Sequence, residues 1–150
     1  MARDRGRSAV GARRLGYTIA AVVNAAMLYA VNVWPGWQVV PFLTADTAAV
    51  IPAVNAALVV GLVANAVYVL QDPPWLKALG DLVTNVVGLV AVVRVWQVFP
   101  FTFGDATFDW ELVARWALAI GFLGSVIAIA VALVSLVHAA VRPLPPPRTA

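Results

Sequence analysis

Cysteine is absent from this 150-residue chain, and histidine and lysine each occur once. The lack of cysteine excludes disulfides, thiol redox chemistry, iron–sulfur clusters and thiolate metal sites. Charged residues are also scarce, at 11% against about 25% in soluble domains, whereas 63% of the residues are hydrophobic. A soluble domain of this size still exposes about 30% of its chain surface, so it cannot hide so much apolar surface. The composition therefore predicts an integral membrane protein.

Four runs of the chain are long and apolar enough to cross a bilayer as helices, which takes about 20 residues each. The expected spans are residues 15–33, 48–70, 78–99 and 112–139. They define a single transmembrane domain over residues 15–142, between a basic tail (1–14) and a proline-rich tail (143–150). The predicted fold class is an all-α membrane protein, a four-transmembrane-helix bundle.

The basic residues predict how these spans are oriented. Eight of the ten lie in residues 1–14, the 71–77 loop and residues 142–150, whereas the 34–47 and 100–110 loops contain none. Because basic loops stay inside, both termini are expected to be cytoplasmic in a multi-pass protein of the cell membrane. The basic tail is expected to contact anionic membrane lipid, and we expect no nucleic-acid partner.

An internal repeat involves the two outer loops. The segment Trp37-Gln38-Val39-Val40-Pro41-Phe42 recurs 59 residues later as Trp96-Gln97-Val98-Phe99-Pro100-Phe101. Each copy belongs to a hairpin of two spans, so the sequence predicts two tandem helical hairpins that run in the same direction. The two loops are then expected to face each other on the outer surface, and we favour a shared interfacial turn over a ligand-capping role.

Polar residues inside the spans require partners, because an unbonded polar group in hydrocarbon costs several kcal/mol. The candidate polar interior consists of Asn24, Asn55, Asn65, Tyr68, Asp81 and Asn85. Residues of the second span (Asn65, Tyr68) and of the third (Asp81, Asn85) form stripes at helical spacing that descend to the inner surface. We expect the stripes to meet, either as interhelical hydrogen bonds or as a polar cavity that opens inward.

A second polar group lies at the outer edge. Arg94 falls inside the third span, where an arginine should find an acidic partner or a water-filled vestibule. The candidate outer ion-pair or anion site consists of Arg94, Gln97, Asp46 and Asp105, with Asp109 and Glu111 as further acidic partners. Two interpretations stay open, namely a structural outer anchor and a cation that binds an anion or a lipid headgroup.

Small residues at four-residue spacing follow one face of the fourth span. They are Gly121, Ser125, Ala128 and Ala132. Because small side chains let helices approach closely, this face predicts packing, either within the bundle or between copies in a homo-oligomer.

No catalytic constellation is recognisable in the sequence, which lacks a Ser–His–Asp arrangement, HExxH, a phosphate loop and a metal-suited carboxylate cluster. We therefore expect neither catalytic residues nor a metal or cofactor. The favoured function is a non-enzymatic structural or accessory membrane protein that self-associates or stabilises a membrane protein partner. The alternatives are a small channel or transporter with an Asn-lined interior, and a binder of lipid or apolar ligands under the aromatic outer loops.

The usage of residue types, rich in alanine, valine and arginine and poor in lysine, resembles that of uncharacterised four-span integral membrane proteins of high-GC bacteria. The resemblance covers the whole chain but concerns composition alone. It implies a bacterial inner membrane and transfers no functional residues.

Overall fold

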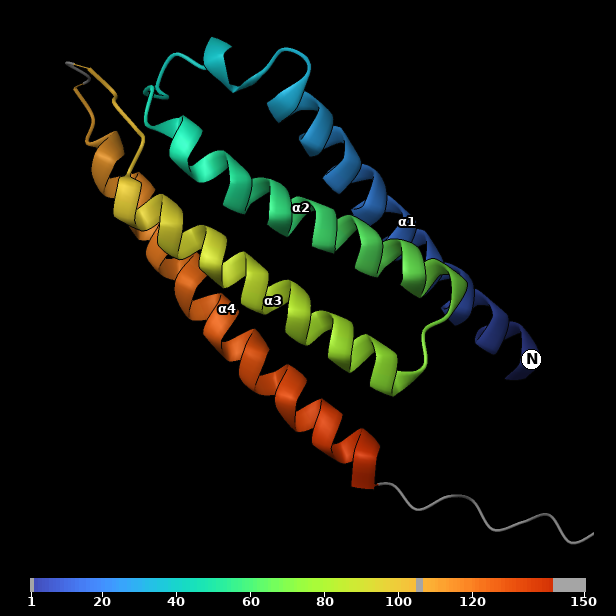
Figure 1. Ribbon diagram of the computed structural model, residues 1–150. Coiled ribbons are helices and arrows are strands. Elements are labelled where there is room, and N and C mark those ends of the chain that lie inside the picture. Colours follow the sequence, from blue (N-terminus) through green and yellow to red (C-terminus); the bar gives the residue numbers. More distant parts are fainter. Residues whose placement is uncertain (1, 105–106, 142–150) are drawn as a thin grey trace, which may run out of the picture.

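The computed structural model of the chain describes residues 2–104 and 107–141, with side chains from residue 10 onward (Figure 1). Its long helices are α1 (Ala2–Asn32), α2 (Thr47–Leu70), α3 (Pro74–Val98) and α4 (Trp110–Val141). A short 3₁₀ helix, η1 (Trp37–Val39), lies between α1 and α2. The described chain contains no β-strand, only an isolated bridge between two loops. The predicted all-α four-helix bundle is thereby confirmed.

Each long helix contains a stretch that is long and apolar enough to cross a membrane. In α1 this stretch is Val10–Asn32, and in the other three it is the whole helix. The 24 residues of α2 reach about 36 Å at 1.5 Å per residue, against about 30 Å of hydrocarbon in a bilayer. A helix satisfies its own backbone polar groups inside lipid, so all four elements are compatible with an integral membrane protein.

Local signals in the sequence set the helix ends. Pro74 begins α3, where its missing N–H costs least. The same helix ends at Val98 and is followed by Phe99, whose φ of 44° is left-handed, and then by Pro100, which cannot continue a helix. Before α4, the Asp109 carboxylate accepts a hydrogen bond of 2.9 Å from the N–H of Leu112, which caps the first turn.

The helices lie side by side in chain order, so extensive packing joins only consecutive helices of the described chain: α1 with α2, α2 with α3, and α3 with α4 (Figure 1). The connections 33–46 and 99–109 lie at one end of the bundle, which we call the two-loop end. The 71–73 connection and the start of α1 lie at the other, the one-loop end, toward which α4 also runs.

Few of the described residues are buried in the interior of this arrangement. Its buried hydrophobic residues are Val50, Tyr68, Ala78, Ala91 and Ala132. Larger aliphatic side chains point outward, as in α4, where Ile120 and Ile127 are 66% and 64% exposed. Such extended apolar surface is unfavourable in water but not in a bilayer, so the outer faces of the helices suit contact with membrane lipids.

The helices extend beyond some of the expected spans. Helix α1 starts at Ala2 and so includes most of the expected basic tail, which contains no proline to interrupt it. Helix α3 begins at Pro74, four residues before the expected span, and α4 runs to Val141. The expected proline-rich tail, 143–150, lies outside the described residues.

Candidate functional site

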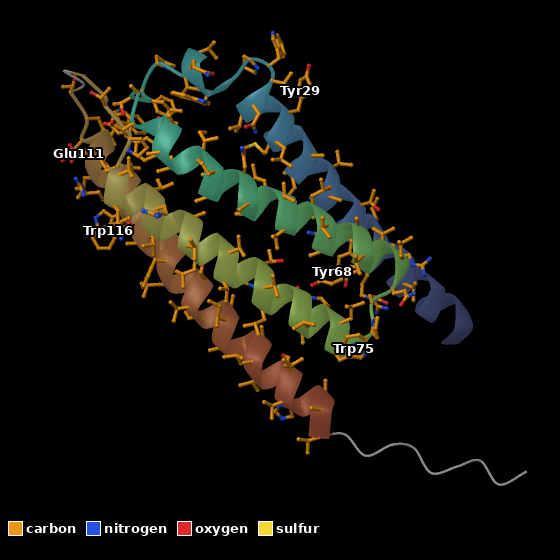
Figure 2. All side chains as sticks on the ribbon, in the orientation of Figure 1. Tyr29, Tyr68, Trp75, Glu111 and Trp116 are labelled. Carbon is orange, nitrogen blue, oxygen red and sulfur yellow. The ribbon has the colours of Figure 1, made fainter. Side chains whose placement is uncertain are left out.

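A polar cluster lies where α2 meets α3 near the one-loop end (Figure 2). The hydroxyl of Tyr68, a residue that is only 4% exposed, shares its single hydrogen between two acceptors on α3. These are the main-chain oxygen of Lys77, at 3.0 Å, and Oδ1 of Asp81, at 3.1 Å. The Lys77 ammonium forms an ion pair with the other oxygen of Asp81, one helical turn away. Both carboxylate oxygens of Asp81 are therefore bonded within the cluster.

Residues of α1 and α3 complete the packing around the Tyr68 side chain. The ring of Tyr17 on α1 meets the Tyr68 ring edge to face, with centroids 5.4 Å apart. On α3, Gly80 leaves room for the Tyr68 hydroxyl, because a Cβ at that position would overlap it. Close by along the chain, Nε of Arg13 on α1 lies 3.1 Å from Oδ2 of Asp72, just before α3. Three helices thus converge at this end of the bundle.

Three of the asparagines expected in the polar interior are bonded within their own helices. Asn24, Asn65 and Asn85 each donate to the main-chain oxygen four residues earlier, at 2.8, 2.8 and 2.7 Å. The expectation that the stripes of α2 and α3 meet is therefore met by Tyr68 and Asp81, whereas Asn65 and Asn85 make no side-chain hydrogen bond across helices within the described chain. A hydrogen bond within the same helix satisfies one N–H of the asparagine amide but does not join two helices.

Asn24 has a second role in packing α1 on α2. Its amide group lies directly over Gly61, where an added Cβ would come within 2.9 Å of the Asn24 oxygen. Gly61 is buried and therefore lets the two helices approach closely at this level.

Asn55 is bonded between helices. It forms a reciprocal pair with Asn32, the last residue of α1: each amide donates to the other's oxygen, at 2.9 and 2.7 Å. Such a pair satisfies one donor and one acceptor on both residues and fixes the register of α1 on α2. Asn32 was not among the residues expected in the polar interior, because it lies at the outer end of the first expected span.

The residues of the expected outer site are not joined in the structure. Arg94 and Gln97 are exposed on α3, and no ion pair links Arg94 to Asp46 or to any other described acid. Asp105 lies outside the described residues. The remaining acids have other contacts, since Asp109 caps α4 and Glu111 pairs with Arg115 at 2.8 Å.

The loops of the two-loop end are paired by backbone hydrogen bonds. The N–H of Thr102 donates to the Phe42 oxygen at 2.9 Å, and the N–H of Thr44 donates to the Pro100 oxygen at 3.0 Å. Pro100 is fully buried beneath this contact. The Pro–Phe parts of the two repeated segments, Trp37–Phe42 and Trp96–Phe101, thus lie side by side and antiparallel.

The two copies nevertheless differ in conformation. Trp37–Val39 forms the separate helix η1, whereas Trp96 and Gln97 belong to the last turn of α3. The duplication itself stays a prediction from the sequence.

The small residues of α4 are occupied within the bundle. Val92 of α3 lies 3.8 Å from the position of a Cβ at Gly121, and Ala132 is 4% exposed, while Ser125 and Ala128 are half-buried. Because α3 is the helix that α4 packs against extensively, this face supports α3–α4 packing. The homo-oligomer alternative stays a prediction from the sequence, since Gly121, Ser125 and Ala128 remain partly exposed.

Comparisons with known protein families, curated proteins and solved structures find no match to this chain. The class defined here is a four-helix bundle whose helices are long and apolar enough to span a membrane.

Proposed function

We propose that this chain is a non-enzymatic membrane protein with a structural or accessory role, inserted as a four-span unit that supports a larger membrane assembly. In this proposal both termini are cytoplasmic, and the membrane is a bacterial inner membrane. The basic residues at the one-loop end and the absence of any from the two outer loops support that orientation.

The observation that supports this role best is the use of the interior polar groups as packing contacts. Tyr68, Asp81 and Lys77 bond one another, Asn32 and Asn55 bond each other, and Asn24 covers Gly61. Four open grooves on the described surface are lined mostly by apolar residues; the one between α2 and α3 includes Tyr68, and none of the four includes these asparagines. The polar side chains therefore serve helix association, which is the property that an assembly unit requires.

The test compares solute flux with stability in the purified protein. In proteoliposomes, we expect proton and small-solute fluxes equal to those of protein-free vesicles. In detergent, we expect Asn55→Leu to lower the unfolding temperature, because it leaves Asn32 without its partner. Ala56→Leu, an exposed neighbour on the same helix, is the matched control and should change little.

Transport is the competing outcome of this experiment. A reproducible wild-type flux that Asp81→Asn removes while the variant keeps its unfolding temperature would overturn the accessory proposal. Co-purification tests the accessory proposal directly. A membrane protein that stays bound to the wild type, and that is lost when the bundle is partly unfolded, would support an accessory role.

A further inference from the structure

The two paired loops and the start of α4 form an open aromatic hollow at the two-loop end. It has a volume of about 550 Å³ and is lined by Pro41, Phe42, Thr102, Phe103 and Trp110. This size falls in the range of small-molecule sites, about 300–1,000 Å³. The lining comes from three separate parts of the chain: the loop before α2, the loop after α3 and the first residue of α4.

The rings around the hollow are held by a stack of aromatic contacts. Phe103 stacks on Phe42 with centroids 5.8 Å apart and an interplanar angle of 21°, and on Phe101 at 6.2 Å and 13°. Phe101 in turn meets Phe99 edge to face at 5.3 Å, and the Arg115 guanidinium lies 4.1 Å from the Phe99 centroid. Together with the backbone bonds that join the loops, this stack fixes Phe42 and Phe103 before any ligand arrives.

Charge at this end favours a cation in the hollow. Aromatic faces carry negative electrostatic potential and attract alkylated ammonium groups. Asp109 directly precedes Trp110, and Asp46 follows Phe42 by four residues, whereas the loops 34–47 and 100–110 contain no basic residue. The nearest cation on α4, Arg115, is engaged with Glu111 and Phe99. Arg94, one turn before the end of α3, is not part of the lining.

We propose that the aromatic hollow binds a small organic cation with an alkylated ammonium group, taken from the aqueous phase. Phe42 and Trp110 supply aromatic surface, Phe103 supports Phe42 from within the stack, and Asp109, next to Trp110 in the chain, supplies a nearby negative charge. The hollow belongs to the loops beyond the helix ends, a level that both dissolved cations and lipid headgroups can reach, and the last experiment below separates these two sources. This binding site is independent of the accessory role, so either proposal can fail alone.

The test uses choline as the probe, with binding to the full chain measured by equilibrium dialysis of the radiolabelled compound. The protein is held in nanodiscs of phosphatidylglycerol, a lipid that has no ammonium group. We expect saturable binding that weakens with added salt, and at least about five-fold weaker competition by 3,3-dimethylbutan-1-ol, which has the same shape without the charge. Equal competition by the neutral compound, or no saturable binding, would overturn the proposal.

Variants of the lining locate the site. Trp110→Leu should weaken choline binding about five-fold, because it removes a ring face but keeps an apolar side chain. Asp109→Asn should weaken it about two- to five-fold, since the amide oxygen can still cap α4. Trp116→Leu, on an exposed part of α4 outside the hollow, is the control and should bind like the wild type. Unchanged binding in both the Trp110 and the Asp109 variant, with unaltered unfolding temperatures, would place choline elsewhere and refute the assignment.

A second arm separates a dissolved ligand from a lipid headgroup. The same dialysis is repeated in nanodiscs of phosphatidylcholine, whose headgroups carry the choline moiety. We expect binding of free choline to persist within about two-fold. Its loss would show that headgroups already fill the hollow, and would overturn the assignment to a soluble cation.

Discussion

Tyr68 on α2 and Asp81 on α3 form the one side-chain-to-side-chain hydrogen bond between these two helices in the described part of the chain, at 3.1 Å. Most of the remaining α2–α3 contact is between apolar groups, which tolerate small slides along the helix axes. A directional bond between two defined atoms tolerates them less. The pair therefore selects one register for α2 on α3, and Lys77 holds the carboxylate in place for it.

Tyr68→Phe tests the energetic contribution of this bond. The substitution keeps the ring that packs against Tyr17 but removes the donor to Asp81 and to the Lys77 oxygen. We expect a loss of about 1 kcal/mol in the free energy of unfolding, within the range measured for hydrogen bonds between membrane helices. Reversible unfolding in mixed micelles, followed by circular dichroism, measures it. Tyr29→Phe, at a 55% exposed position with no described side-chain hydrogen bond, is the control (Figure 2). Equal effects of the two substitutions would contradict the role given to Tyr68.

Gly80→Ala tests the close packing of α3 against the Tyr68 hydroxyl. A Cβ at Gly80 would overlap the Tyr68 hydroxyl, so α2 and α3 must separate or the ring must leave its site. We expect a loss of about 1–3 kcal/mol, the usual effect of overpacking. Gly88→Ala on the same helix is the matched control, since nothing lies within 4 Å of its added methyl group. That variant should be neutral or slightly stabilising, because alanine has the higher helix propensity. Thermal unfolding of the two purified variants decides, and a Gly80→Ala protein as stable as Gly88→Ala would refute this packing.

Apolar runs and end signals were sufficient to predict the four helices, because a span of about 20 apolar residues has few alternatives in a bilayer. Spacing also placed Tyr68 and Asp81 on stripes that meet. Spacing could not show that Asn65 and Asn85 would bond their own backbones, since that choice depends on how each helix is rotated toward its neighbours. The face of small residues on α4 illustrates the same limit: the sequence predicted packing, and the structure identifies α3 as the partner.

Other contacts depend on residues far apart in the chain. Gly80 carries no signal of its own until Tyr68 is known to lie over it. Asn32 lies at the end of the first expected span and Asn55 well inside the second, so the expected depths did not suggest that the two residues would pair. The loop pairing of Phe42 with Thr102 required the actual path of both loops.

The Asn32–Asn55 pair predicts a strong coupling in a double-mutant cycle. Asn32→Leu and Asn55→Leu should each destabilise the bundle, because each leaves one amide without its interhelical partner. In the double variant no unpaired amide remains, so the combined loss should fall short of the sum by about 0.6–2 kcal/mol. Unfolding of the four proteins under one set of conditions gives the coupling. Strict additivity would show that the two side chains do not interact in the folded protein.

The proposed orientation is testable without removing any native residue that reacts with thiol reagents, because the chain contains no cysteine. Ala45 lies in the first connection of the two-loop end and Gln71 in the connection of the one-loop end, and both are exposed. In intact cells that express single-cysteine variants, a membrane-impermeant maleimide should label Ala45→Cys, whereas Gln71→Cys should react only after permeabilisation. The physical reason is the distribution of charge: the basic residues flank the one-loop end, and under the proposed orientation they keep it on the cytoplasmic side. The reverse pattern would invert the protein in the membrane, place the aromatic hollow on the cytoplasmic side, and refute the assignment of both termini to the cytoplasm.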